Sequence, residues 1–438
     1  MHQSVYERRR KEFMGKMKSG VAIFPSAPVR NRNGDVDYKY RQDSDFFYLT
    51  GFEEPESFCI LLPGNPKHEY LLFVRHRDRE KEIWNGLREG VEGAIENFRA
   101  DMAFTVDRLE EILPEFLQNA PVLYFPLHRY PEADERVFGI LDIVRQKHRA
   151  GIYPPSEIVD PWLILSDMRL IKKADEMESF ARAVEISAKA HTEAMKAVSP
   201  GMYEYEIQAV IEYVFRSNGA LRNGYPSIVG SGPNSCILHY TNNNRRMQDG
   251  DMLLVDAGAE FDYYSGDITR TYPVNGKFTA EQKAVYETVL RAQMTAIAAS
   301  RPGVSFMQVH EIALHSLTEG LIELGLLSGS VDENIEKQHY QKYFMHRTGH
   351  WLGIDVHDVG KYKKDNSWRV LEPGMVMTVE PGLYISGDDE HEAFRSIGVR
   401  IEDDIMITEG EPLVLSASCP KQIAQLEEIL GSRSRILQ

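Results

Sequence analysis

The sequence predicts two domains, an α/β domain over residues 1–160 and an α+β domain over residues 161–438. Three observations support this prediction. Short apolar runs alternate with charged segments in the first part, a proline-rich segment follows, and an α-α-β unit occurs twice in the second part. A chain of 438 residues also has the length of roughly two or three ordinary domains.

The first domain is predicted from the β-rich runs FCILLP, EYLLFV and PVLYFP, which alternate with helix-compatible segments such as VDRLEEILPEFLQ. The segment GIYPPSEIVDPW follows them and contains Pro154, Pro155 and Pro161. Proline has no amide hydrogen and cannot lie inside a helix or a central strand. We therefore expect the domain boundary in this segment.

The second domain contains a repeat. KAHTEAMKAVSPGMYEYEIQAVIEYV, which starts at Lys189, aligns with RAQMTAIAASRPGVSFMQVHEIALHS, which starts at Arg291. Each copy is typical of a helix, a Pro-Gly break and a second amphipathic helix, and Ser305 with Gln308 predicts a capping box. Chance similarity between two helices could explain this match alone.

A second match follows in the same order, because GDMLLVDAG and GMVMTVEPG place Asp256 and Glu380 at the same position of the two copies. Two ordered matches favour a duplicated α-α-β unit. Each acid ends an apolar, β-branched run that predicts a buried strand. A buried carboxylate without a partner is so costly that it binds a cation or takes up a proton.

Asp267 is a predicted companion of Asp256. If the turn between them is centred on Phe261 and Asp262, the two acids face each other across an antiparallel pair. They would then repel each other unless a divalent ion lies between them. This register depends on a Phe-Asp turn, which lacks the usual Asn-Gly signal.

The strand SIGVRIEDDIMIT places Arg400, Glu402 and Asp404 on one face, because side chains alternate along a strand. A solvated face with an ion pair is the preferred interpretation for Asp404. The interpretation of Glu402 depends on whether the other acids form a site with it.

Three histidines, His346, His350 and His357, lie in the segment HRTGHWLGIDVHD. The first two have the spacing of the HExxH zinc motif, but Arg347 stands where that motif requires Glu. Glycines nearby also argue against a helix. Histidines in such a segment are more often structural than metal ligands, so their assignment depends on their context.

Composition excludes several classes of protein. Asp and Glu outnumber Lys and Arg by 66 to 50, and the net charge of −16 disfavours nucleic acid as a partner. Cys59, Cys236 and Cys419 are scattered, which predicts neither a disulfide framework nor a thiolate zinc site. No apolar run reaches the roughly 20 residues that span a bilayer, and the run VAIF is too short for a signal peptide. We expect a cytoplasmic protein without a membrane partner.

In order and spacing, the segments VDAG, GDITRTY, GHWLGIDVHD, EPGLY and RIEDD resemble the metallopeptidases of the pita-bread fold, a creatinase/methionine aminopeptidase-like fold with an internal pseudo-twofold repeat. The resemblance is strongest to the aminopeptidase P family, and it extends over YRQDSDFFYLTGFEEPES, IVGSGPNSCILHYTNN and HWLGIDVHDVG. One departure is the stretch HRTG before His350, where small residues are common in the wider fold.

The resemblance implies hydrolysis of the N-terminal Xaa-Pro bond of peptides by a hydroxide that bridges two divalent metal ions. The implied ligands are Asp256, Asp267, His350, Glu380 and Glu402. A ligand set rich in oxygen with one imidazole suits manganese, although zinc, cobalt or iron could occupy it. Its substrates would be peptides with proline at the second position.

The resemblance also implies roles for further residues. Glu380 would transfer the proton, His239 and His357 would hydrogen-bond the substrate and the developing oxyanion, and His346 would hold the substrate beyond the cleaved bond. For Arg400, a catalytic support and a structural ion pair are equal interpretations. Trp84 resembles a position that reaches the pocket of a neighbouring subunit, but a plain hydrophobic anchor is the preferred interpretation.

The first domain would serve oligomerisation and substrate gating in a homodimer or homotetramer. The nearest alternative function is that of a prolidase, which shares the metal site but accepts only dipeptides. A peptide-binding module without activity is a further alternative. It is disfavoured because such proteins usually lose metal ligands, and all five ligand types are present here.

Overall fold

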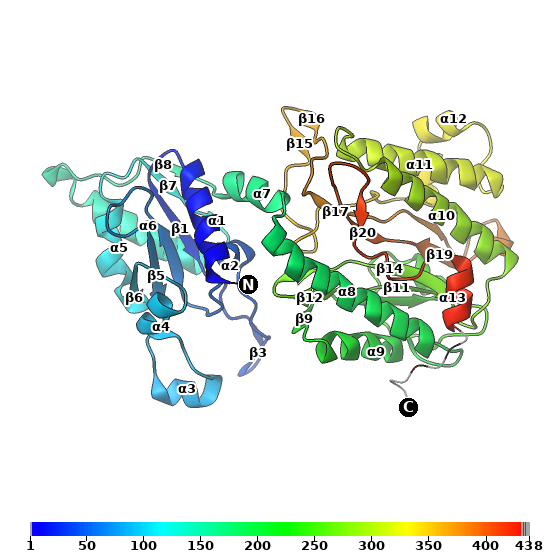
Figure 1. The fold of residues 1–438 in the computed structure, drawn as a ribbon, viewed down its shortest axis with the longest axis horizontal. Helices are drawn as coiled ribbons and strands as arrows, with labels where there is room; N and C mark the ends of the chain where they lie inside the picture. The colour runs from blue at the N-terminus through cyan, green and yellow to red at the C-terminus, as the bar shows by residue number, and fades with distance from the viewer. Residues whose placement is uncertain (1, 431, 433, 435–438) are drawn as a thin grey trace. The chain divides into compact units, whose positions relative to one another are not determined.

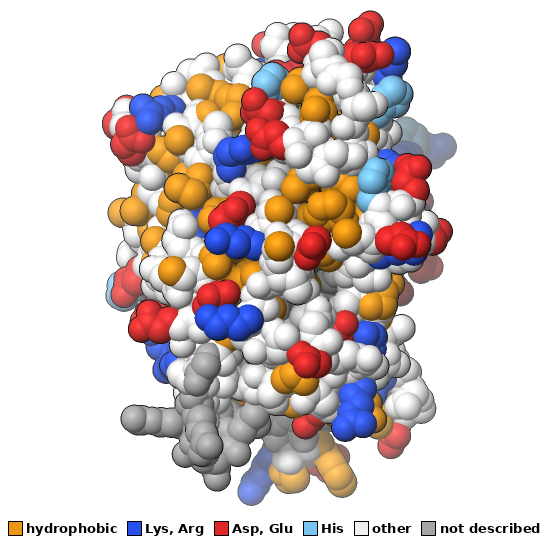
Figure 2. Space-filling view, turned by 90° about the vertical axis from the view of Figure 1, so that its right-hand side faces the viewer, with side chains coloured by type: hydrophobic (Ala, Val, Ile, Leu, Met, Phe, Trp, Pro, Cys, Tyr) orange, Lys and Arg blue, Asp and Glu red, His pale blue; other side chains and the backbone are white. Residues whose placement is uncertain are grey.

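The computed structural model describes residues 2–430, 432 and 434. It divides into two compact units, Met1–Met168 and Arg169–Gln438 (Figure 1). None of the helices among the described residues is long and apolar enough to cross a membrane. On the face shown in Figure 2, basic and acidic side chains are interspersed rather than gathered by sign.

The first unit is built on a six-stranded sheet with mixed strand directions. In spatial order, its strands are β6 (Met102–Thr105), β5 (Tyr70–Val74), β4 (Phe58–Leu61), β1 (Val21–Pro25), β7 (Val122–Tyr124) and β8 (Glu157–Val159). The three β-rich runs form β4, β5 and β7, as predicted. β8 lies inside the proline-rich segment and pairs with β7, and the units divide within α7 (Trp162–Leu170).

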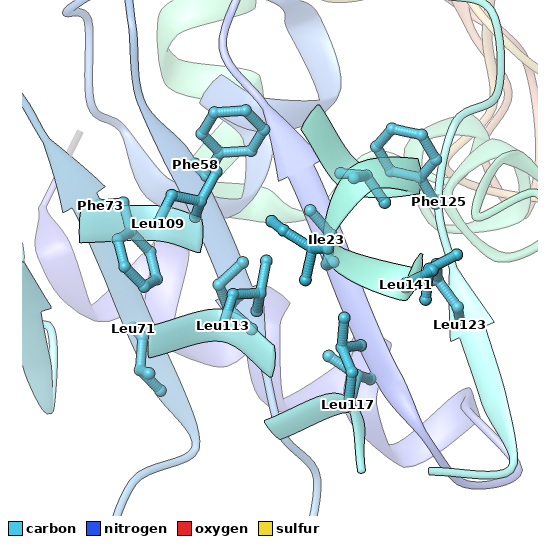
Figure 3. Close-up of a cluster of buried hydrophobic side chains, with 14 of the residues drawn as sticks. Ile23, Phe58, Leu71, Phe73, Leu109, Leu113, Leu117, Leu123, Phe125 and Leu141 are labelled. Carbon is cyan, nitrogen blue, oxygen red and sulfur yellow. The ribbon is translucent and has the colours of Figure 1, made fainter. Parts of the chain in front are cut away.

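The core of the first unit lies between this sheet and two helices, α5 (Leu109–Leu117) and α6 (Pro131–Arg145). Leu109, Leu113 and Leu117 are four residues apart, so they share one face of α5 and join the buried cluster that contains Ile23 and Phe73 (Figure 3). The other helices of this unit are α1 (Gln3–Lys16), α2 (Ser44–Thr50), α3 (Arg79–Asn85) and α4 (Gly90–Glu96).

The second unit contains the predicted helix pairs. They are α8 (Ala174–Ala197) with α9 (Glu204–Ser217), and α10 (Ala280–Ala299) with α11 (Phe306–Glu323). Gly201 and Gly303 break the two pairs with φ of 94° and 91°, a conformation that glycine adopts without strain. The capping box is also confirmed, since the Gln308 amide donates to Ser305 Oγ and the Ser305 amide donates to Gln308 Oε1.

The strands of the second unit form several short antiparallel sheets that lie between the two helix pairs in Figure 1. One sheet orders β10 (Ile228–Ser231), β11 (Met252–Asp256) and β14 (Thr269–Pro273), and another orders β17 (Val376–Val379), β20 (Asp403–Met406) and β21 (Leu413–Val414). A third pairs β18 (Gly382–Ile385) with β19 (Ile397–Arg400). β11 and β17 come after the first and second helix pairs, with other short elements between each pair and its strand, so the predicted order of helix, helix and strand occurs twice.

The predicted register between Asp256 and Asp267 is wrong. In β12 (Ala259–Phe261) and β13 (Tyr264–Ser265), Phe261 pairs with Tyr264, so the turn residues are Asp262 and Tyr263. Both have positive φ, 47° and 71°, which is the left-handed pair of a tight hairpin turn. Asp256 is consequently opposite Thr269 instead of Asp267.

Candidate metal centre and substrate pocket

A cavity of about 500 Å³ in the second unit brings most of the predicted site residues together. Those that line it are Asp256, Asp267, His350, Glu380, Glu402, His239, His346, His357 and Arg400. They come from strand ends and loops: Asp256 ends β11, Glu380 follows β17, and Glu402 lies between β19 and β20. Polar side chains from both copies of the repeat therefore share one cavity.

Asp267, His350 and Glu402 form the centre of this group. One ligand atom from each lies within 4.8 Å of the others. The Nδ1–H of His350 can donate to the Trp351 carbonyl at 3.0 Å, which leaves Nε2 facing Asp267 Oδ2 at 3.3 Å and Glu380 Oε1 at 3.6 Å. Such a backbone contact fixes the ring orientation of a metal-ligating histidine.

Asp256 reaches the same centre through Tyr225. The Tyr225 hydroxyl lies 2.6 Å from Asp256 Oδ1 and 2.5 Å from Asp267 Oδ1, so it joins the two acids although they are not cross-strand partners. A hydroxyl has one proton and can donate it to only one of the two carboxyl groups. The other carboxyl group therefore needs another proton or a cation as its partner. Arg400 Nη2 donates to the other oxygen of Asp256 at 2.7 Å.

The segment around Glu402 is held from two directions. The Glu402 amide donates to the Thr269 carbonyl at 3.1 Å, and Thr269 Oγ1 donates to Glu402 Oε2 at 2.6 Å. Below them, Arg270 Nη1 donates to the Glu402 carbonyl at 2.6 Å. The predicted single strand is therefore interrupted at residues 401–402, where the chain passes from β19 to β20.

The electrostatics of the cavity test whether these residues fit metal ions. Burial raises the pKa of Glu402 well above its ordinary value, and burial raises that of Glu380 to about 7; neighbouring acids add to both shifts. For His350, burial lowers the pKa, but the bond to Asp267 and the charge of Glu380 outweigh it and raise the pKa to about 9. A cluster of acids that attracts a proton to a histidine fits divalent cations.

Two other histidines of the cavity, His346 and His357, have lowered pKa values. Burial lowers the pKa of His346 to about 3 and also lowers that of His357. Both ring nitrogens of His346 are engaged, because Nδ1 lies 2.8 Å from the Arg347 carbonyl and Nε2 lies 2.8 Å from the Tyr384 hydroxyl. The His357 ring packs edge-on against His350 with ring centroids 4.4 Å apart.

Buried ion pairs hold the loop that carries His357. Asp358 accepts from Arg169 Nη2 at 2.5 Å and from Lys172 Nζ at 2.9 Å. Gly353 lies so close that an added Cβ would be 2.2 Å from Asp358 Oδ2, which explains why glycine is needed there. These ion pairs could not be predicted from the spacing of charged residues, because the partners are far apart in the sequence.

Sequence reasoning did not identify three cavity contacts. Tyr225 lines the cavity, Tyr384 accepts from Arg400 Nη1 at 2.9 Å, and Thr269 binds Glu402. Each acts through a hydroxyl group. Hydroxyl residues are common in strands and carry no charge pattern, so no sequence signal beyond closeness to an acid could have marked them.

The interpretation of Asp404 as solvated is wrong. Asp404 lies on β20 and is fully buried, with its carboxyl group against the backbone of Asp267. Its Oδ2 accepts from the Asp267 amide at 3.0 Å, and its Oδ1 has no hydrogen-bond partner among the described residues. It therefore lies behind the metal centre as an additional buried acid.

Trp84 does not line the cavity. It lies on α3 in the first unit and is 85% exposed in the single chain. Its own chain therefore does not cover it, and its role as a hydrophobic anchor or as a residue that reaches a neighbouring subunit stays a prediction. Ile83 and Leu87 nearby are also exposed.

Comparisons with known proteins agree along the whole chain. The model of metallopeptidase family M24 matches residues 178–409, and the model of the aminopeptidase P N-terminal domain matches residues 6–124. The chain is 44% identical to an Xaa-Pro aminopeptidase of Escherichia coli (strain K12) over 428 residues, which are 97% of this chain and 97% of that protein. It is 33% identical to an Xaa-Pro dipeptidase of Homo sapiens, with 98% and 92% covered.

Two solved structures resemble this one over nearly their full length. The structure of Pseudomonas aeruginosa aminopeptidase PepP has a TM-score of 0.97 at 47% identity, with 98% of each chain covered. Zinc-substituted E. coli aminopeptidase P in complex with product has a TM-score of 0.96 at 43% identity, again with 98% of each chain covered.

Proposed function

This chain belongs to the aminopeptidase P group of metallopeptidase family M24, and on that premise we propose that it releases the N-terminal residue from peptides whose second residue is proline. One observation carries the proposal: the five implied metal ligands and four further polar residues line a single cavity. Pro226, Ile228, Leu238 and Val356 also line it. Their apolar side chains fit a proline ring.

Asp256, Asp267, His350, Glu380 and Glu402 would hold two divalent ions, most favourably manganese. Divalent ions bound there supply Lewis acidity to the scissile carbonyl and lower the pKa of a water molecule. The oxygen-rich donor set, with His350 as the sole imidazole among the five, supports this choice of metal.

Glu380 is the residue that would move the proton. Its carboxylate lines the cavity and lies 3.6 Å from His350 Nε2, where it can accept a proton and release it again. Its carboxylate would take the proton of the attacking water and pass it to the proline nitrogen of the leaving part. This nitrogen has no hydrogen of its own in the peptide bond.

Two further residues would bind the substrate directly, and two more would support the site. His239 and His357 line the cavity and would donate to the substrate carbonyl and to the developing oxyanion. Arg400 connects through the Tyr384 hydroxyl to His346, which would lie beside the leaving part of the peptide. This chain of hydrogen bonds would keep His346 in place rather than free it to donate to the substrate.

The proposal includes assembly and location. We place the catalytic domain at residues 161–438 and assign oligomerisation and substrate gating to residues 1–160, in a homodimer or homotetramer. The exposed Trp84 supports an intersubunit role for the first unit. The three free cysteines support a reducing compartment such as the cytoplasm.

The test is a peptide assay on manganese-loaded protein, with Ala-Pro and Ala-Pro-Ala as substrates and free alanine as the readout. We expect cleavage of the tripeptide, and loss of that cleavage in His350→Ala and Glu380→Ala. Cleavage of the dipeptide alone would make the protein a prolidase. No cleavage with any divalent metal, together with peptide binding, would favour a binding module.

A further inference from the structure

Arg347 lines the cavity but has no part in the chemistry described so far. It is the charged residue in the HRTG stretch, where small residues were expected. Its guanidinium lies over the ring of Trp368, 5.0 Å from the centroid, on the hairpin of β15 (Lys363–Lys364) and β16 (Ser367–Trp368). A cation–π contact of this kind holds an arginine without using its N–H groups.

Arg347 differs in this respect from Arg400, the other arginine of the cavity wall. Arg400 is buried and donates to Asp256 and to the Tyr384 hydroxyl. In the described part of the chain, the Arg347 guanidinium forms no hydrogen bond and no ion pair. Its five N–H donors are arranged in a fork that matches a carboxylate, and they remain available at the cavity wall.

Arg347 also lies next to the residues that would contact the leaving part of the peptide. Its carbonyl accepts from the adjacent His346 ring at 2.8 Å, and His346 Nδ1 is 4.0 Å from Glu380 Oε2. Under the proposed function, Glu380 passes a proton to the leaving nitrogen. The residue after the substrate proline would then lie on the side of the cavity that carries His346 and Arg347.

We propose that Arg347 binds a carboxylate on the leaving part of the substrate, and that the enzyme therefore prefers short peptides that end one residue after the proline. This inference rests on the proposed function. Four acids line the same cavity and the chain carries a net charge of −16, so a substrate carboxylate needs a cation at its position. The main-chain carboxylate of a tripeptide and an acidic side chain at the third position share the required chemistry.

The test compares kcat/KM for Ala-Pro-Ala and Ala-Pro-Ala-amide on manganese-loaded wild type and Arg347→Gln. We expect the wild type to prefer the free acid by roughly fivefold to tenfold, as a charge-assisted pair gives. Arg347→Gln should cleave both peptides at the wild-type rate for the amide. Arg347→Lys should recover part of the preference, because it keeps the charge but loses the fork.

Ala-Pro-Glu-amide distinguishes the two sources of the carboxylate. Cleavage faster than that of Ala-Pro-Ala-amide, and dependent on Arg347, would include acidic side chains in the preference. Equal cleavage of these two amides would assign the site to the main-chain carboxylate alone.

Lys364→Gln is the matched control, since it removes one positive charge from the exposed end of the neighbouring hairpin. It should keep the wild-type ratio of acid to amide. A ratio near one in the wild type, or an equal loss in Lys364→Gln and Arg347→Gln, would overturn the inference and leave the proposed function intact. No cleavage of any of the peptides would count against the proposed function itself.

Discussion

Asp403 and Asp404 are neighbours on β20 and both are fully buried. Their carboxyl groups differ in the charges of the side chains around them. Asp403 accepts from Arg270 at 2.7 Å and from Lys421 at 2.5 Å. Burial alone would raise the pKa of Asp403, but the charges of Arg270 and Lys421 hold it below its ordinary value. Burial raises the pKa of Asp404 well above its ordinary value, and the charge of Asp267 adds to the shift.

The difference teaches that burial of an acid does not mark a ligand by itself. The face of β20 that carries Asp403 contains its own cations, so its charge is balanced within the chain. The face that carries Asp404 turns toward the acids of the cavity, where the chain supplies too few cations. The acids on that face must therefore take up protons or bind cations from outside the chain.

Removing one ligand should produce the largest effect. Glu402→Gln should lower kcat/KM for Ala-Pro-Ala by about a thousandfold, because metal catalysis supplies several kcal/mol. The unfolding temperature of the metal-free variant should be unchanged or higher, since a repelling charge is removed. Kinetics and thermal unfolding measure the two effects. Glu372→Gln, at an exposed surface ion pair, is the control and should change neither.

A pair of substitutions on β20 tests the comparison directly. Asp403→Asn should reduce the free energy of unfolding by about 3–5 kcal/mol, because Arg270 and Lys421 would be left buried near a neutral amide. Asp404→Asn should cost less than about 1 kcal/mol in metal-free protein, since Asn can still accept from the Asp267 amide. Equal losses in urea unfolding would contradict the comparison.

The pH dependence of metal-free protein should follow the acids of the cavity. The pKa of Glu380 is about 7 in the folded protein, above its ordinary value of 4.5. The contribution of Glu380 to the free energy of unfolding is therefore fully present below pH 4.5 and is lost as pH rises through 7. The loss is about 3 kcal/mol. Asp403 acts oppositely, because its lowered pKa removes stability only as pH falls below 3.8.

Urea unfolding of chelated protein between pH 5 and 8 measures this slope. Glu380→Gln should flatten it, and metal should do the same in the wild type because it stabilises the ionised acids. A slope that Glu380→Gln leaves unchanged would show that other groups cause it.

Tyr225→Phe should weaken metal binding without abolishing it. It removes the hydroxyl that joins Asp256 to Asp267, which orients both acids without itself being one of the five ligands. Metal affinity should fall about tenfold, as is usual for loss of such a supporting contact. Calorimetric titration with manganese measures it, and Tyr213→Phe, which changes an exposed tyrosine on α9, is the control.

Much of the fold could be predicted because its signals are local. The period of the apolar residues marks the helices, the Pro-Gly breaks mark their ends, and the repeated order of α8, α9 and β11 marks the duplication. The acids at the strand ends could also be predicted as site residues, because a carboxylate directly after a buried apolar run is uncommon.

The remainder depends on contacts between distant segments. The register near Asp267 is set by two left-handed residues, Asp262 and Tyr263, which carry no usual turn signal. The burial of Asp404 involves the backbone of Asp267, which is 137 residues away in the sequence. The hydroxyl of Tyr225 meets its acids only in the folded chain. None of these follows from the pattern of a single segment.

The duplicated unit has a consequence for how a peptide is oriented. A cavity built from two identical copies would present the same wall to both ends of a peptide and could not tell one end from the other. Here the first copy supplies Asp256 and Asp267, whereas the second supplies His350, Glu380 and the histidines on either side of His350. Because both copies belong to one chain, their residues can differ, and the two walls of the cavity differ as well. This asymmetry allows the enzyme to bind a peptide in one orientation only.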